Sequence, residues 1–280
     1  MKPLTKTTAS SKPKLIVLVV LYKKKISESP TISHLLLQNR ALFEVELVIW
    51  DNSPEPSPEQ EVSGLAGEFD KFQYISSPEN VWLSKLYNQV LRSNTYDYAL
   101  LLDQDSEFPE FYFDKLKIAI LGFPHISLFL PIVMNNRKVV SPGSFVYFKG
   151  KHWEKIKTGL ISSKNVLAIT SGMVISVKVF LAHQMEFDER LNLYGIDTSF
   201  MLRFSKFEKQ LYVLRIKFDH DTVLWSNPSA DVMLSRFRNL KATWPKILSD
   251  RPVALVLAYF YSKAVSLKMA LKYHDMRFLK

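Results

Sequence analysis

The sequence feature that most constrains the fold is an uninterrupted apolar run that ends in two carboxylates. Residues 98–102 read Tyr-Ala-Leu-Leu-Leu, and Asp103-Gln104-Asp105 follows directly. A short run of this kind is typical of a central strand that is covered on both faces. Because ligands of open α/β sheets bind beyond the carboxyl ends of the strands, Asp103 and Asp105 are predicted to face a ligand. Such carboxylates suit Mg²⁺ or Mn²⁺ held against a diphosphate, and a solvated acidic turn is the plain alternative.

Strand and helix patterns alternate on both sides of this run. This order predicts right-handed βαβ units in a mostly parallel sheet flanked by helices. From residue 135 to 170, short strand-like pieces alternate with Pro-Gly and Lys-Gly turns. The predicted strands are 15–22, 45–50, 72–75, 98–102, 126–133, 173–179 and 211–218, and the predicted helices are 32–43, 81–93, 109–121 and 198–207.

The two ends of the chain differ from this α/β part. Residues 1–14 are polar and basic, so we expect a disordered lead-in. Residues 227–280 are predicted to form a C-terminal helical region, with helices over 230–248 and 253–278. The last helix mixes lysines with apolar residues. It is therefore predicted either to lie on an anionic membrane face or to pack on its own domain.

Composition excludes several classes of protein and site. The absence of cysteine excludes a disulfide scaffold and cysteine-based metal sites. Neither a Rossmann glycine motif nor a P-loop motif is present. The apolar run 15–22 is too short to span a bilayer, and no signal-peptide cleavage site follows it. The formal net charge of +10 favours anionic partners such as nucleotides, nucleic acid or anionic lipid.

Four landmarks in this order resemble family 2 glycosyltransferases, which use nucleotide sugars and have the GT-A fold. They look most similar to rhamnosyltransferase-like members that build bacterial surface polysaccharides such as O-antigen. The landmarks are the strand 15–22, Trp50-Asp51-Asn52-Ser53, the segment from Glu79-Asn80 through Ser84-Lys85-Leu86-Tyr87-Asn88, and Asp103-Gln104-Asp105. The resemblance covers roughly residues 15–221. It implies a GT-A domain over 15–226, with a donor half at 15–134 and an acceptor half at 135–226.

The resemblance also implies roles for residues near the strand ends. Asp51, Asn80, Asn88 and Asp103 would bind the nucleotide sugar, and Asp103, Asp105 and His220 would hold Mn²⁺ or Mg²⁺. Without the resemblance, Asp51 reads as a turn residue, Asn80 as a helix cap, and His220 as a hydrogen-bonded strand end.

Asp197 is the predicted general base. It follows Gly195 at the start of a predicted helix, so its carboxylate can project into a cleft and take a proton from an acceptor hydroxyl. A simple helix cap is the alternative, and Asp188 and Glu189 are the second choice for the base. Arg203 is predicted to pair with a phosphate, with Asp197, or with solvent. Ser171-Gly172 would shape the acceptor side, on the resemblance alone.

Two departures from the family pattern matter. Trp82 replaces a glycine, so the loop over the sugar phosphate can have another shape. The Gln-x-x-Arg-Trp motif of processive synthases is absent, which argues for transfer of a single sugar.

The predicted function is inverting, metal-dependent transfer of one sugar from a UDP- or dTDP-linked donor to a glycan or lipid-linked acceptor. The protein is expected in the cytoplasm, peripheral on the inner face of the cytoplasmic membrane, with no nucleic-acid partner. Two alternatives stay open. One is a nucleotidyltransferase acting on sugar phosphates. The other is an inactive GT-A scaffold that binds membrane or nucleic acid through its basic surface.

Overall fold

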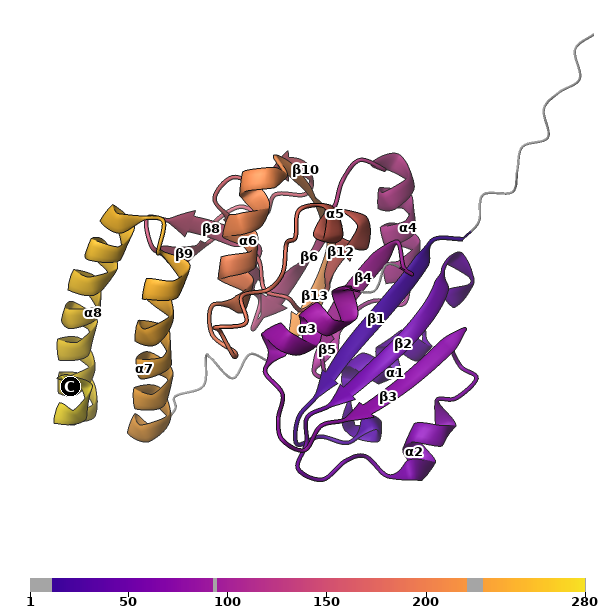
Figure 1. Cartoon of the computed structure of the whole chain (residues 1–280), viewed down its shortest axis with the longest axis horizontal. Coiled ribbons are helices and arrows are strands. Elements are labelled where there is room, and N and C mark those ends of the chain that lie inside the picture. The colour runs from indigo at the N-terminus through magenta and orange to yellow at the C-terminus, as the bar shows by residue number, and fades with distance from the viewer. Residues whose placement is uncertain (1–11, 93–94, 221–228, 280) are drawn as a thin grey trace, which may run out of the picture.

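A computed structural model describes residues 12–92, 95–220 and 229–279. Figure 1 shows a twisted central sheet with helices on both of its faces, and a pair of long helices at one side. The predicted lead-in lies almost entirely outside the described residues. The strands are β1 (Lys14–Leu21), β2 (Glu44–Asp51), β3 (Lys71–Ser76), β4 (Tyr98–Asp103), β5 (Ser106–Glu107), β6 (Leu128–Asn135), β7 (Lys138–Ser141), β8 (Gly143–Val146), β9 (Lys149–His152), β10 (Gly159–Ser162), β11 (Val166–Leu167), β12 (Met173–Ser176) and β13 (Gln210–His220). The helices are α1 (Pro30–Leu36), α2 (Glu59–Gly64), α3 (Leu83–Leu91), α4 (Tyr112–Gly122), α5 (Val177–Ala182), α6 (Ile196–Phe207), α7 (Ala230–Ile247) and α8 (Pro252–Tyr273).

The central sheet is mostly parallel, as predicted. Its strand order is β10-β13-β6-β12-β4-β1-β2-β3, with β5 paired to β13 and β7 paired to β6. Strands β1 to β4, β6 and β13 run in one direction, whereas β12 and β10 run against their neighbours. A separate small sheet has the order β11-β8-β9. The α/β class and the C-terminal helical region are therefore confirmed.

The apolar runs are continuous because the sheet separates two cores. In β1, Leu15, Val17 and Val19 enter the core that contains α1 and α4, while Ile16 and Leu18 enter the core that contains α3 and α6. Successive side chains of a strand point to opposite faces, so a strand covered on both faces needs apolar residues at every position. This is why the run that ends at Asp103 has no polar interruption.

The chain changes direction across the sheet at β1. It moves outward from β1 to β2 and β3, and returns to place β4 on the other side of β1. The connections at the carboxyl ends of β1 and β4 therefore leave in opposite directions. A crevice opens at such a switch point, and ligands of α/β sheets bind there.

The helix predicted over 32–43 is interrupted. Helix α1 ends at Leu36, and only a short 3₁₀ turn, η2 (Arg40–Leu42), follows. Gln38 lies between them and is buried, with its amide donating to the carbonyls of His34 and Pro109 and accepting from the Phe113 amide. Contacts to the segment leading into α4 thus determine where α1 stops, and helical spacing alone could not indicate them.

The C-terminal helices pack on the small sheet and on α6. Trp244 and Leu248, at the end of α7, share an apolar cluster with Phe145 of β8 and Leu202 of α6. The predicted helix 253–278 ends early, because His274 adopts a left-handed conformation with φ 51° before the 3₁₀ turn η4 (Met276–Leu279).

Candidate active site

The turn that carries Asp103 and Asp105 is held through its backbone by α1. The Thr31 hydroxyl donates to the Asp103 carbonyl at 2.6 Å and accepts from the Ser106 amide at 2.8 Å, and the Ser29 hydroxyl donates to the Gln104 carbonyl at 2.7 Å. These bonds fix the turn without using either carboxylate. The sequence Asp103-Gln104-Asp105 thus presents two acidic side chains on a rigid support.

Gln104 joins this turn to the end of β1. The backbone amide of Tyr22 donates to the Gln104 side-chain oxygen at 2.7 Å, and the Gln104 amide donates to the Tyr22 carbonyl at 3.2 Å. The middle residue of the acidic motif therefore connects the two strands that border the switch point.

A cavity of about 800 Å³ lies at this switch point. One side is formed by the ends of β1 and β4, the opposite side by the segment that leads into α6, and α7 adds one side chain. The lining residues include Val20, Tyr22, Asn52, Asn80, Trp82, Tyr87, Asp103, Gln104, Asp105, Thr170, Asn192, Tyr194, Asp197 and Arg236. The predicted residues Asn80, Asp103, Asp105 and Asp197 thus meet in one hollow.

Asp197 lies in the first turn of α6, facing this cavity. Gly195 caps the helix with φ 80°, a conformation that favours glycine, and one carboxylate oxygen of Asp197 accepts from the Thr198 amide at 2.7 Å. Burial, and to a smaller extent the charge of Asp103, raises the pKa of Asp197 to about 6, against the opposing hydrogen bond from Thr198. A half-buried carboxyl with such a pKa can take up a proton near neutral pH, as a general base must.

A second cavity of about 180 Å³ lies on the other side of Asp197. It shares Asp197, Val140 and Ile169 with the large cavity. The rest of its lining comes mainly from Thr198 and from the β7–β9 region, including Ser141, Gly143, Ser144, Gly150, Lys151 and His152. Asp197 is therefore a carboxylate at the boundary between two cavities, and Asp103 and Asp105 line only the larger one.

Tyr87 lies between the acidic residues of the large cavity. Its hydroxyl is 3.4 Å from that of Thr170. Burial, followed by the charges of Asp103 and Asp197, raises the pKa of Tyr87, so the phenol stays protonated. It is available as a neutral hydrogen-bond donor beside the carboxylates.

Asp51 lies outside the cavity, contrary to the predicted contact with the donor. It is fully buried, and its carboxylate accepts from Tyr74 OH at 2.6 Å and from the amides of Ser53 and Ser57 at 2.9 and 3.0 Å. Burial raises the pKa of Asp51, but these hydrogen bonds together hold it below its ordinary value. Asp51 thus organises the turn after β2, and its neighbour Asn52 lines the cavity instead.

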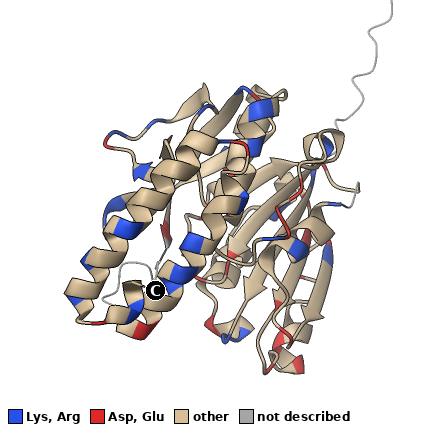
Figure 2. Cartoon of the chain, turned by 60° about the vertical axis from the view of Figure 1, so that its left-hand side comes forward, with Lys and Arg blue, Asp and Glu red and all other residues tan. Residues whose placement is uncertain are grey.

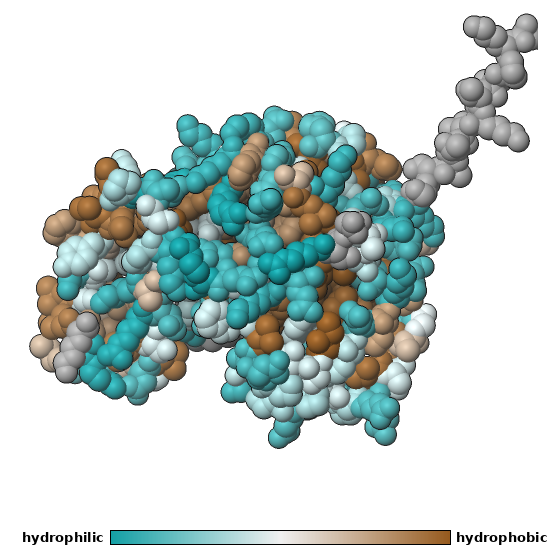
Figure 3. All heavy atoms as spheres, in the orientation of Figure 1, coloured by the Kyte–Doolittle hydropathy of each residue, from teal (hydrophilic) through white to brown (hydrophobic). Residues whose placement is uncertain are grey.

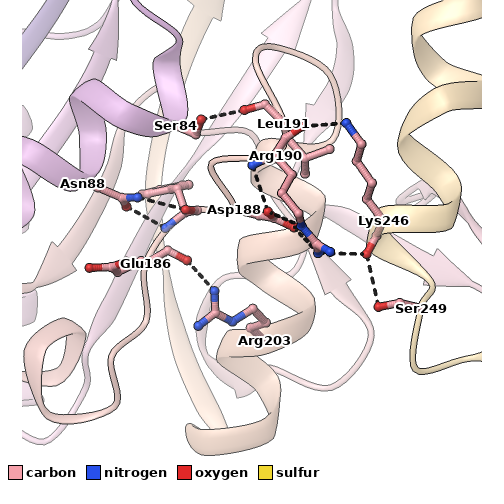
Figure 4. A network of polar contacts seen from close by, with 10 residues as sticks. Ser84, Asn88, Glu186, Asp188, Arg190, Leu191, Arg203, Lys246 and Ser249 are labelled. Carbon is pink, nitrogen blue, oxygen red and sulfur yellow. Dashed lines mark hydrogen bonds and ion pairs between the residues drawn. The ribbon is translucent and has the colours of Figure 1, made fainter.

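Asn88 is also removed from the cavity. It is fully buried in α3, where its amide donates to the Phe187 carbonyl and to Glu189, and accepts from the Phe187 amide. Figure 4 shows these bonds joining α3 to the segment that precedes α6. Asn80 does line the cavity, and its φ of 56° explains an asparagine there, since asparagine tolerates the left-handed region.

The second-choice carboxylates and Arg203 belong to polar networks outside the cavities, and Figure 4 shows Asp188 and Arg203 in one of them. Asp188 pairs with Arg190 at 2.7 Å, and Glu189 pairs with Arg92 at 3.3 Å. Arg203 donates to the carbonyls of Glu186 and Gln184. These groups hold the segment before α6 in place and do not line either cavity.

Ser171 and Gly172 support the site from behind. Ser171 is buried, with its hydroxyl 2.6 Å from that of Ser106. At Gly172 a Cβ would lie 2.5 Å from the Pro131 ring, and φ is 81°, so close packing and backbone conformation both require glycine. The cavity lining comes from the preceding residues, Ile169 and Thr170.

The donor set fits a divalent cation that also binds substrate phosphates. Within residues 12–92, 95–220 and 229–279, no group of three or more acidic or histidine side chains is placed to hold a metal ion. Mg²⁺ and Mn²⁺ need only one or two protein carboxylates when phosphates complete the coordination, and Asp103 and Asp105 supply two. His220 ends β13 and pairs with Ser106, next to Asp105, but its side chain lies outside the described part.

Several cavity residues were not predicted from the sequence. Asn52 makes paired bonds to the backbone of Val81, and it was visible only as part of the Asp-Asn-Ser landmark. Tyr87 carried a weak signal, a polar-tipped side chain on an apolar helix face. Arg236 carried none, because α7 reaches the cavity only through tertiary packing.

Comparisons with known proteins agree with this geometry. A family model described as "Glycosyl transferase family 2" matches residues 17–210, which is more than half of the chain. A search of curated proteins finds no match. The family predicted from the four landmarks is confirmed, and the rhamnosyltransferase-like subtype stays a prediction.

Solved structures of TarS from S. aureus share the fold. TarS 1–349 in complex with UDP is 16% identical to this chain, with a TM-score of 0.54. The match covers 82% of this chain and 64% of the TarS chain. TarS 1–349 in complex with UDP-GlcNAc is also 16% identical, with a TM-score of 0.55, and the match covers 82% of this chain and 66% of the TarS chain. This chain spans only 39% of the longer TarS structure, with a TM-score of 0.53. These likenesses confirm the predicted GT-A fold.

Proposed function

This chain belongs to glycosyl transferase family 2, and on that premise we propose that it transfers one sugar from a nucleotide diphosphate sugar to a hydroxyl group. The observation that carries the proposal is the position of Asp197 at the boundary of two cavities, only one of which contains Asp103 and Asp105. A transfer reaction needs two such compartments, one for the donor and one for the acceptor, with a base between them.

The donor occupies the large cavity in this proposal. Its diphosphate lies against Asp103 and Asp105, together with Mg²⁺ or Mn²⁺, and such a cation supplies Lewis-acid stabilisation of the charge on the departing diphosphate. Tyr87 and Arg236 line the same cavity and can donate hydrogen bonds to the donor. The complexes of TarS with UDP and UDP-GlcNAc support testing a UDP-linked donor first, with a dTDP-linked donor second.

The acceptor approaches from the second cavity. Its hydroxyl oxygen forms a bond to the anomeric carbon while the bond from that carbon to the diphosphate oxygen breaks. The hydroxyl proton passes to Asp197, and the nucleoside diphosphate leaves with the electron pair. Attack from the side opposite the leaving group is a single displacement, so the configuration at the anomeric carbon inverts. Asp197 is suited to this role because its raised pKa makes it a stronger base than an ordinary aspartate.

The acceptor and location predicted from the sequence complete the proposal. The acceptor is a glycan or a lipid-linked intermediate of bacterial surface polysaccharide synthesis. The reaction takes place at the inner face of the cytoplasmic membrane. The resemblance of the four landmarks and the basic C-terminal helices support this part.

The direct test is ligand-induced stabilisation. UDP with Mn²⁺ should raise the melting temperature of the wild-type protein, because a ligand that binds only the native state stabilises it. Asp105→Asn should remove most of this increase, and so should EDTA. Glu107→Gln is the matched control, because Glu107 is exposed, lies two residues away and does not line the cavity. An increase that survives both EDTA and Asp105→Asn would contradict the metal role.

A further inference from the structure

Helix α8 packs on α7 with small side chains at the centre of the contact and larger, partly buried ones beside them. Its buried residues are Ala258, Ser262, Ser266 and Ala270, which recur at every fourth position. Ala258 contacts a cluster that includes Trp244 and Leu248, and Ala270 contacts one that includes Leu234 and Phe237, all from α7 or directly after it. Leu255, Val265, Met269 and Tyr273 are partly buried beside them, so this inner face covers only part of the apolar surface of the helix.

Six other large apolar side chains of α8 face the opposite way. We define the outer stripe as Val253, Val256, Leu257, Phe260, Leu267 and Leu271. Each of these residues is 40–73% exposed. Their spacing of three, four and seven residues places them along one side of the helix. A helix of a water-soluble domain normally turns such a stripe toward the core, and an exposed stripe of this size marks an interaction surface.

The stripe lies at the edge of the molecule. In Figure 1, α8 is the outermost element on the side away from β3. Figure 3 shows brown, apolar side chains along the same edge. Figure 2 shows α7 and α8 from the side, with Lys and Arg recurring along both helices.

Charge indicates which partner this surface fits. Lys263, Lys268 and Lys272 flank the outer stripe, whereas residues 252–262 carry no charge. Residues 229–279 contain nine Lys or Arg and three Asp or Glu. A second copy of the chain would bring like charges together, whereas lysines beside an apolar stripe can extend their ammonium groups toward anionic headgroups.

We propose that the outer stripe of α8 docks on a bilayer that contains anionic lipid, with the helix lying in the plane of the interface. Its 22 residues span about 33 Å and pass a length and hydropathy criterion for crossing a membrane. The inner face, however, is committed to α7, and α8 carries three lysines. These two features favour docking over spanning.

Docking would hold the active site close to the lipid. Helix α7 contacts α8 on one side and contributes Arg236 to the large cavity on the other. At the end of α7, Ile247 packs against Gly195, two residues before Asp197. A bilayer-bound α8 thus places both cavities within reach of a lipid-linked acceptor. This benefit rests on the proposed function, whereas the docking itself does not.

The test is cosedimentation of the full chain with vesicles. Binding to vesicles of phosphatidylcholine and phosphatidylglycerol should exceed binding to phosphatidylcholine alone, and salt should weaken it. Phe260→Ser with Leu267→Ser should lower the partition coefficient about tenfold or more, because two large side chains no longer enter the interface. Lys268→Gln with Lys272→Gln should lower binding only to the anionic vesicles.

Ile118→Ser with Leu121→Ser is the matched control, since both residues are exposed apolar positions on α4. It should bind vesicles as the wild type does. Equal binding by wild type and by the outer-stripe variant would overturn the proposal. The proposal would also be overturned if light scattering showed a wild-type dimer that does not bind vesicles and that the outer-stripe substitutions dissociate. UDP binding measured in parallel separates these failures from a failure of the proposed function.

Discussion

At the scale of single residues, Asp197 combines the position of the proposed general base with a cost in stability. Its folded-state pKa of about 6 lies above the ordinary value of 3.8, chiefly because burial removes part of the water around the carboxyl. The ionised form is therefore disfavoured in the folded protein. It destabilises the fold, and the penalty is complete above about pH 6, shrinks as the pH falls below that value, and is gone below the ordinary pKa of 3.8.

Asp197→Asn should consequently stabilise the protein while it abolishes transfer. At pH 7 we expect the free energy of unfolding to rise by about 1 kcal/mol, discounted because the side chain is only half-buried. Transfer should fall roughly 10²- to 10⁴-fold, the usual contribution of a general base. Chemical unfolding at pH 5 and pH 7, together with an assay of sugar transfer, measures both effects. If Asp197 only capped α6, the substitution would instead leave stability nearly unchanged at both pH values, because asparagine caps a helix about as well as aspartate does.

At the scale of elements, the small sheet lines the cavity through which we propose that the acceptor reaches Asp197. Strands β8 and β9 approach closely at Gly143, where a Cβ would lie 2.8 Å from the Lys151 carbonyl oxygen. Gly150 also lines the second cavity, but a Cβ there would make only an ordinary contact of 3.4 Å with Leu167. Gly150 can therefore accept a side chain without distortion of the backbone, and that side chain would occupy the cavity.

Gly150→Phe should block the acceptor and leave the donor in place. We expect the ratio of sugar transfer to donor hydrolysis to fall about tenfold or more, since the acceptor hydroxyl no longer reaches the base. The affinity for UDP, measured by calorimetry, should stay unchanged. Val146→Phe is the control, because Val146 pairs with Lys149 on the same hairpin and lies outside the cavity. Equal transfer by both variants would place the acceptor elsewhere.

At the scale of the whole molecule, the C-terminal helices are part of the support for the active site. The Lys246 ammonium donates to the Arg190 carbonyl at 2.6 Å, and Lys206 of α6 pairs with Asp250 at 2.5 Å. These bonds are exposed, so each adds little stability. Together with the contact of Ile247 on Gly195, they position the segment that leads to Asp197.

Gly195→Ala tests this coupling. The left-handed backbone should cost about 1–2 kcal/mol of unfolding free energy, and the new Cβ would lie 2.4 Å from the end of Ile247. Ile247→Ala in the same chain removes the close contact with the new Cβ and leaves the strain of the left-handed backbone. If α7 positions Asp197, the double variant should recover part of the lost transfer activity but little of the stability. If the effects of the two substitutions on activity are simply additive, α7 and the base are independent.

The sequence alone determined the elements whose cause is local. The predicted bounds are close to the observed ones for the strands 98–102 and 15–22 and for the helices 198–207 and 230–248. Continuous apolar runs and helical spacing are patterns of neighbouring residues, so the sequence shows them directly. The same holds for the placing of Asp103, Asp105 and Asp197, since a strand end and a helix start follow directly from those patterns.

Tertiary structure alone decided which side chains share a cavity. Asp51 and Asn88 have the residue types of a binding site, yet both point into hydrogen-bond networks, because distant partners such as Tyr74 and Phe187 approach them. Arg236 enters the cavity, and α8 turns its outer stripe toward solvent, for the same reason: packing between segments far apart in the chain decides which face is covered. Local periodicity carries no information about that choice.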